Sequence, residues 1–150
     1  MKTKRIIKDQ KGGALIEFAI VLPLLVLFVI GLIEFGLLMY NKHMITNASR
    51  EGARAGIVQA GDDYSDNTAI KTIVMDYCNP RLIDFDGTSL TINDITLNPT
   101  DRIALGFGQD FSVFVTYDYH FMIPSLFGLG TTSTITAQTA MKMEENISGP

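Results

Sequence analysis

The stretch Gly12-Gly13-Ala14-Leu15-Ile16-Glu17-Phe18 decides how the chain is built, because a carboxylate at Glu17 stands where a long apolar segment begins. Residues 18–40 then give 23 positions with a single charged side chain, Glu34. At 1.5 Å per residue such a helix is about 35 Å long, enough to cross a hydrocarbon core of about 30 Å with some tilt. The segment therefore predicts a membrane-spanning helix, and Pro23 is a place where it can kink.

Charge is distributed unevenly about this segment. Residues 1–12 hold five basic side chains and one acidic one (net +4), and the rest of the chain holds seven basic and fifteen acidic ones (net −8). Because basic residues gather on the cytoplasmic side of membrane helices, we expect the N-terminus inside and the acidic remainder outside. A secretory signal peptide is the competing interpretation, but the apolar run is too long and no small-residue cleavage site follows it. The acidic remainder also argues against nucleic-acid binding.

Glu34 lies in the outer half of the predicted membrane helix. A carboxylate at the bilayer centre costs about 2.5–3.5 kcal/mol, and less toward a helix end. Two interpretations stay open for this side chain. Either it is protonated or reaches the interface, or it contacts a partner helix.

Beyond the apolar run, residues 41–60 contain no proline and keep a helical pattern. Small residues recur there every four positions, at Ala48, Gly52, Gly56 and Ala60. Such a small-residue ridge lets another backbone approach closely. Since each glycine costs a helix about 1 kcal/mol relative to alanine, an offsetting packing contact is expected. Its partner is either the chain's own sheet or another subunit.

Residues 61–150 have the pattern of a small head outside the membrane. Asn67, or the residue before it, can cap a helix that runs to about Tyr77 with an apolar stripe on one face. The other elements are strands, recognisable by apolar side chains at every second position, and together they predict an antiparallel sheet in an α+β fold. The first strand shifts its apolar phase between Ile92 and Ile95, which predicts a bulge. The expected strands are residues 89–97, 111–123 and 132–143.

Patterns typical of catalytic or metal sites are missing from the sequence. His43 and His120 lack metal-ligand spacing, and no nucleophile or phosphate-binding motif is present. Asp84 and Asp86 resemble the start of a calcium loop, but the closing glutamate is missing, so an ordinary polar turn is expected. The single cysteine, Cys78, excludes an intramolecular disulfide and is best explained as a small buried hydrophobe. We therefore expect no enzyme and no cofactor.

Three blocks of sequence follow one another in the N-terminal third: Lys-Gly-Gly-Ala-Leu-Ile-Glu-Phe-Ala-Ile-Val-Leu-Pro-Leu-Leu (11–25), Ile-Glu-Phe-Gly (33–36) and Thr-Asn-Ala-Ser-Arg-Glu-Gly-Ala-Arg (46–54). Through these blocks, residues 12–56 resemble the N-terminal motif of the TadE-like family, minor pseudopilins of the tight-adherence (Flp-type) pilus. Phe18 stands where the major Flp pilins usually have tyrosine, which favours the minor-subunit branch. The resemblance implies a pilin-like chain with a basic leader (1–12), a helix that spans and leaves the membrane (13–60), and a head (61–150).

The resemblance also implies processing by a prepilin peptidase, which cuts after a glycine and leaves a glutamate at the fifth mature position. Counting back from Glu17 puts the cut after Gly12 and makes Gly13 the first mature residue, while a cut after Gly13 stays open and puts Glu17 fourth. A free α-amine ordinarily has a pKa of about 8 and is largely cationic at neutral pH, so a neighbour's amine could compensate a buried Glu17. The alternative is that Glu17 simply lies at the interface, near the N-terminal end of the helix dipole.

The function implied by the resemblance is that of a pseudopilin or minor pilin in Flp-type pilus assembly. Such a protein is a single-pass component of the bacterial cytoplasmic membrane, with its head outside. The resemblance also allows a place for the subunit in a pilus or at its tip. Its implied partners are the prepilin peptidase, other pilins or pseudopilins, the inner-membrane assembly platform and membrane lipid. The assembly contacts are expected from Gly13, Glu17 and Glu34. The alternative is a membrane-anchored extracytoplasmic binding or sensory domain whose leader is never removed.

Overall fold

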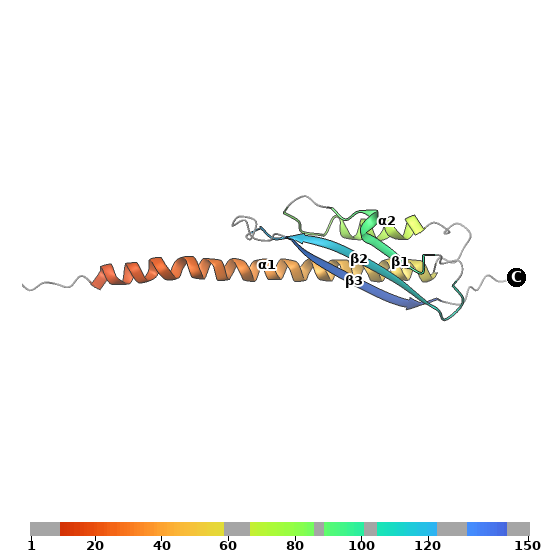
Figure 1. Cartoon of the computed structure of the whole chain (residues 1–150), viewed down its shortest axis with the longest axis horizontal. Coiled ribbons are helices and arrows are strands. Elements are labelled where there is room, and N and C mark those ends of the chain that lie inside the picture. Colours follow the sequence, from red (N-terminus) through yellow and green to blue (C-terminus); the bar gives the residue numbers. More distant parts are fainter. Residues whose placement is uncertain (1–9, 59–66, 86–88, 101–104, 123–131, 144–150) are drawn as a thin grey trace, which may run out of the picture. The chain divides into compact units, whose positions relative to one another are not determined.

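The computed structural model describes residues 10–58, 67–85, 89–100, 105–122 and 132–143 (Figure 1). The chain divides into two compact units, Met1–Phe35 and Gly36–Pro150. One long helix, a second helix and a three-stranded antiparallel sheet confirm the predicted α+β fold. Along the chain the elements are α1 (Gln10–Val58), α2 (Asn67–Cys78), the 3-10 turn η2 (Ile92–Asp94), β1 (Ile95–Asn98), β2 (Asp110–His120) and β3 (Thr132–Lys142).

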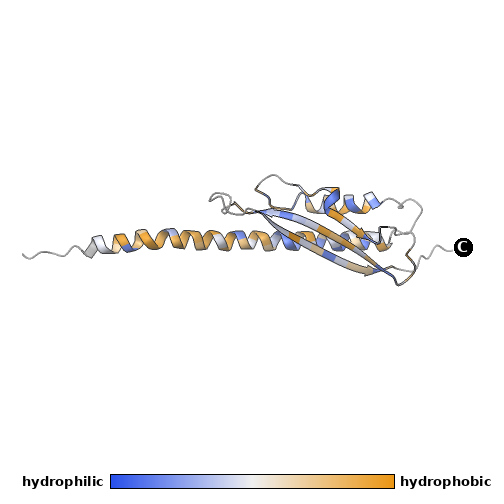
Figure 2. Cartoon of the chain, viewed as in Figure 1, coloured by the Kyte–Doolittle hydropathy of each residue, from blue (hydrophilic) through white to orange (hydrophobic). Residues whose placement is uncertain are grey.

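The part of α1 in the N-terminal unit carries exposed apolar side chains, seen as a nearly continuous apolar band in Figure 2. Between Leu15 and Ile33, the large apolar side chains on the open surface have exposed fractions of 42–71%. The helix passes through Pro23 without interruption. By length and composition it can cross a membrane, with a mean hydropathy of 2.9 in its most apolar window. This segment therefore suggests a membrane anchor, because lipid or partner helices would cover surface that water does not favour.

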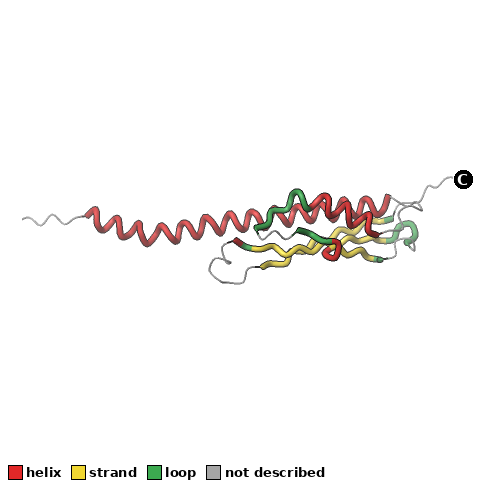
Figure 3. Tube along the Cα trace, turned by 90° about the horizontal axis from the view of Figure 1, so that it is seen from above, coloured by secondary structure: helices red, strands yellow, loops and turns green. Residues whose placement is uncertain are grey.

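In the head unit, the C-terminal part of α1 and the whole of α2 cover one face of the sheet (Figure 1; Figure 3). The core lies between these two layers. Strand β2 alternates buried and more exposed positions, because successive side chains of a strand point to opposite faces of the sheet. Helix α2 faces the core with Ile70, Val74 and Cys78, which recur every four residues. The inward side chains of β2 are Phe111, Val113, Val115, Tyr117 and Tyr119.

The sheet has the strand order β1-β2-β3, and both neighbouring pairs are antiparallel. The register places Val115 between Ile95 on β1 and Ala137 on β3. Because each strand reverses the direction of its neighbour, β1 and β3 run the same way. The predicted strands at residues 111–123 and 132–143 correspond to β2 and β3, and the predicted second helix corresponds to α2.

The expectation of a strand from residue 89 with a bulge is wrong, because β1 begins only at Ile95. The preceding three residues form the turn η2. The carboxylate of Asp94 accepts hydrogen bonds from the main-chain nitrogen (2.8 Å) and the hydroxyl (2.6 Å) of Thr91, and so closes a capping box. These local hydrogen bonds compete with strand pairing and turn the chain there.

Two buried side chains of α1, Asn41 and Ser49, make polar contacts with the rest of the head. The buried amide of Asn41 donates to the carbonyl of Ile83 (2.6 Å) and accepts from its main-chain nitrogen (3.0 Å). The buried hydroxyl of Ser49 lies 2.7 Å from that of Thr139 on β3. Since buried polar groups are costly without partners, these two contacts fix the rotation of α1 over the sheet.

Gly52 and Gly56 are the places where α1 approaches the other elements most closely. A Cβ atom at Gly52 would lie 2.5 Å from Cγ2 of Val74 on α2. A Cβ atom at Gly56 would lie 2.8 Å from Cδ1 and 2.9 Å from Cζ of the Phe111 ring on β2. A real Cβ atom does not come this near, so only glycine lets α1 close onto α2 and β2 at these positions.

We predict that Gly56→Ala lowers the free energy of unfolding of the head, because overpacking against Phe111 costs about 1–3 kcal/mol. The gain of about 1 kcal/mol in helix propensity offsets only part of this cost. Denaturant unfolding of the full chain in detergent measures the change. Gly36→Ala is the matched control, since a Cβ there meets nothing within 4 Å, and it should leave stability unchanged or raise it. Equal stability of the two variants would contradict the packing role of Gly56.

Candidate functional site

The two glycines expected at the processing site lie in the first turn of α1, which begins at Gln10. A Cβ atom at Gly12 or Gly13 would meet nothing within 4 Å. Adjacent glycines weaken a helix by about 1 kcal/mol each relative to alanine, so the first turn opens easily. The bond between Gly12 and Gly13 is therefore both open to approach and weakly held in helical form.

Glu17 follows Gly13 by four residues, so the two lie on the same face of α1, one turn apart. Its side chain is exposed among exposed apolar neighbours. Within the part of the chain that the structure describes, no hydrogen bond or ion pair reaches this carboxylate. In an apolar environment a carboxylate needs a compensating partner, and Glu17 is free to take one from outside the chain.

Glu34 differs from the other side chains near the end of the N-terminal unit. It is 5% exposed, whereas Ile33 and Phe35 on either side of it are 54% and 61% exposed. The carboxylate therefore lies on the sheltered side of the helix and the apolar side chains on the open side. This arrangement keeps the charged group off the surface that lipid would contact.

The small-residue ridge of α1 lies in the head unit. Ala48 is fully buried, and Gly52 and Gly56 face α2 and β2 of the same chain. Ala60 lies outside the described residues. At the two glycines the chain's own side chains fill the space that a second subunit would need.

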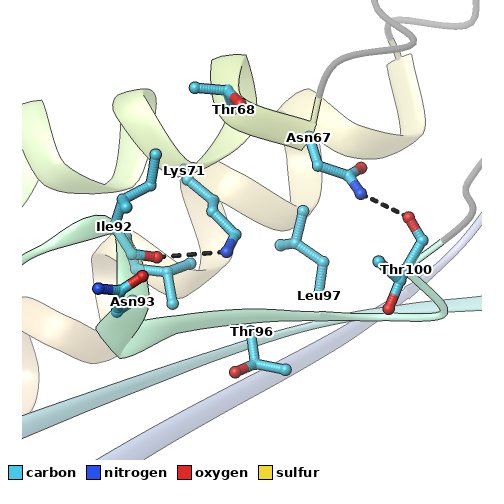
Figure 4. A pocket seen from close by; sticks show the side chains of 9 residues that line it. Asn67, Thr68, Lys71, Ile92, Asn93, Thr96, Leu97 and Thr100 are labelled. Atoms are coloured by element: carbon cyan, nitrogen blue, oxygen red, sulfur yellow. Dashed lines mark hydrogen bonds between the residues drawn. The ribbon is translucent and has the colours of Figure 1, made fainter.

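The head also contains a hollow of about 310 Å³ between α2 and β1 (Figure 4). At one end lies Asn67, whose amide donates to the carbonyl of Thr100 at 2.5 Å. At the other end the ammonium of Lys71 donates to the carbonyl of Ile92 at 3.2 Å. Sequence reasoning missed this hollow, because the packing of α2, η2 and β1 is what brings its residues together. The remaining lining comes from Thr68, Asn93, Ile95, Thr96 and Leu97.

Two buried ionisable groups in the head are held in their neutral forms. Cys78 is a free thiol, fully buried as the sequence predicts, and burial raises its pKa to about 11 despite the lowering effect of the Arg81 charge. Burial, then the charge of Asp84 and then Tyr119 raise the pKa of Tyr117 to about 12. The Tyr117 hydroxyl has no hydrogen-bond partner among the described residues.

No group of three or more histidine, cysteine, aspartate or glutamate side chains is placed to hold a metal ion within the described ranges. Asp84 is described, but Asp86 lies outside them. The structure thus leaves the resemblance of these residues to a calcium loop without a geometry to support it.

Comparison with known proteins confirms the resemblance of the N-terminal region. The family described as TadE-like protein matches residues 12–54. This stretch contains both glycines, Glu17, Glu34 and the first half of the small-residue ridge, and it ends before the sheet. No curated protein and no solved structure matches the chain. TadE-like proteins are a pilus-associated structural family, so the match suggests involvement in a Tad pilus system.

We predict that Tyr117→Phe raises the free energy of unfolding at neutral pH by about 1 kcal/mol, because a buried hydroxyl without a partner is destabilising. Above pH 10 the unfolded chain loses the Tyr117 proton before the folded head does. Stability of the wild-type head should therefore fall as pH rises from about 10 to about 12, and the variant should lose less. Denaturant unfolding at a series of pH values measures both effects. Tyr77→Phe is the control, and identical pH profiles for the two variants would contradict the prediction.

Proposed function

We propose that the chain is a pseudopilin, or minor pilin, that takes part in assembly of a Flp-type (tight-adherence) pilus after a prepilin peptidase removes residues 1–12. The observation that carries this proposal is the TadE-like match, which begins at Gly12, where the expected cut lies, and extends over the apolar helix. The proposed location is the bacterial cytoplasmic membrane, with the head outside. The proposed partners are the peptidase, other pilins or pseudopilins, the assembly platform and membrane lipid.

The charge of residues 1–12 supports a role for cleavage in releasing the anchor. Their net charge of +4 holds the N-terminus on the cytoplasmic side of the membrane. A cut after Gly12 removes this charge and leaves one α-amine at Gly13, which is largely cationic at neutral pH. The subunit then keeps an apolar helix that neighbouring helices can surround.

Glu17 is the proposed partner for such an amine. In our proposal its carboxylate pairs with the Gly13 amine of an adjacent subunit and sets the register of the two helices. Exposure of the side chain and its lack of a partner within the described residues support this role. Glu34 is proposed as a second assembly contact near the other end of the anchor, because a carboxylate in an apolar segment marks a specific polar contact. Since Glu34 is only 5% exposed, this contact requires its side chain to turn outward during assembly.

A second candidate function is a membrane-anchored extracytoplasmic binding or sensory domain with an uncleaved leader. The hollow between α2 and β1 favours it, because it lies outside the TadE-like match and is lined by polar side chains together with apolar ones. The two candidates differ in whether residues 1–12 are removed.

We predict that Gly12→Leu abolishes processing, because the cut requires a glycine at its N-terminal side and a bulky side chain cannot replace it there. The mass and N-terminal sequence of the protein from membranes with and without an active prepilin peptidase measure the cut. Wild-type chains should begin at Gly13 only when the peptidase is active. Gly13→Ala is the matched control and should still be cut after Gly12. A wild-type chain that keeps Met1 both with and without an active peptidase would contradict the pseudopilin proposal.

We further predict that Glu17→Ala is processed normally but enters the assembly much less than the wild-type chain, because the neighbour's amine loses its counter-charge. Isolation of the assembled fraction and quantification of the subunit in it measure the effect. Glu51→Ala removes an exposed carboxylate from the same helix in the head and should have no effect. Wild-type incorporation of the processed Glu17→Ala chain would refute the contact.

A further inference from the structure

Strand β3 forms one edge of the sheet, and half of its main-chain groups face away from β2. Met143 donates its main-chain N–H to the carbonyl of Gln109 (2.8 Å), which fixes the alternation of the ladder. Odd-numbered residues of β3 therefore bond to β2, and even-numbered residues point their N–H and C=O groups outward. The carbonyl of Thr136 confirms this, since it accepts a hydrogen bond from Lys42 on α1 rather than from β2.

The same alternation shows which groups of β1 point outward. Residues of β2 that bond to β3 cannot bond to β1, so Thr96 and Asn98 are the residues of β1 that bond to β2. The main-chain carbonyl of Ile95 and both main-chain groups of Leu97 point the other way. No other described residue forms a hydrogen bond with the main chain of Leu97. The hollow beside α2 runs along this edge, with Ile95, Thr96 and Leu97 in its lining (Figure 4).

The two edges have the direction that side-by-side copies of a membrane-anchored chain require. Because β2 is antiparallel to both of its neighbours, β1 and β3 are parallel to each other. A copy that is moved sideways without rotation presents its β1 to the β3 of the first copy in parallel orientation. All anchors then enter the membrane in the same direction, which any assembly in a shared membrane needs.

We propose that the heads associate edge to edge, with the outer edge of β3 of one copy seated along β1 of the next, in the hollow beside α2. Strand β3 is eleven residues long, and it has neither proline nor charge between Thr132 and Met141. Proteins that avoid edge pairing place prolines or charges on their edge strands. The outer edge of β3 is therefore suited to accept another strand, except at the Thr136 carbonyl, which Lys42 already occupies. The shortness of β1 limits the number of hydrogen bonds, and the contact therefore depends on the local concentration that the membrane provides.

Cysteine cross-linking of the full chain in membrane vesicles tests this contact. Thr96 and Gln138 flank Phe114 in the register, so within one chain they are separated by two strand spacings, about 9.5 Å. This exceeds the limit of about 7 Å between Cα atoms for a disulfide, so a bond between cysteines at these positions must join two chains. We expect Thr96→Cys/Gln138→Cys to give a ladder of dimers, trimers and larger species on oxidation. Pairing Thr96→Cys with Thr134→Cys or Thr136→Cys covers the neighbouring registers.

The single variants are the matched controls, and neither should cross-link, because the contact joins two different edges. The buried Cys78 is present in all of them. Dimers from Gln138→Cys alone would show β3 pairing with itself and overturn the proposal, as would the absence of a ladder at all three pairings. Addition of Gly12→Leu should leave the ladder unchanged, because the contact lies in the head and does not depend on processing.

Thr136→Pro, added to the cross-linking pair, should abolish the ladder. Proline removes the outward N–H of Thr136 but no bond between β2 and β3. Thr136→Lys, which adds a charge at the same exposed edge position, should act in the same way. Denaturant unfolding of the Thr136→Pro and Thr136→Lys variants in detergent is the control for an intact head. A ladder that persists in folded chains with either substitution would overturn the proposal.

Discussion

The close approach of α1 to α2 and β2 at Gly52 and Gly56 is the constraint on which the head depends. Without a side chain at these two positions, Val74 and the Phe111 ring can reach the helix surface and close the core. Loss of helix propensity at the glycines is offset by this packing. The buried amide of Asn41 and the buried hydroxyl of Ser49 fix the rotation of α1 in this contact, because each must meet one particular hydrogen-bond partner.

One continuous helix thus meets two different requirements. Up to Phe35 most of its side chains are large, apolar and exposed, as a lipid or partner-helix environment demands, and Glu17 and Glu34 are the charged exceptions. Beyond that point small and polar residues take the inner face, and the helix becomes one layer of a globular core. The TadE-like match spans both regions but ends at residue 54, so the resemblance covers most of α1 and none of the sheet.

The elements with strong periodicity could be predicted from the sequence, and those formed by local side-chain hydrogen bonds could not. Alternation along β2 and β3 and the stripe of α2 each follow from burying one face of an element. The turn η2 was missed because the capping box at Thr91 outweighs a strand-like pattern of side chains. The roles of the glycine pair and Glu17 stay predictions, which rest on a family motif in contiguous sequence. The hollow beside β1 depends on three elements meeting in space, which no local pattern encodes.

The hydroxyl pair of Ser49 and Thr139 joins residues 90 positions apart, and this separation bears on how the head folds. The core-forming part of α1 is synthesised before β3, which follows the other described strands in the sequence. Contacts of such long range form slowly, because the chain loses the entropy of closing a large loop before the contacts can stabilise it. A nascent subunit therefore leaves the buried hydroxyl of Ser49 without its partner until β3 has been made. In that interval the unpaired strands are open to proteases and to wrong partners.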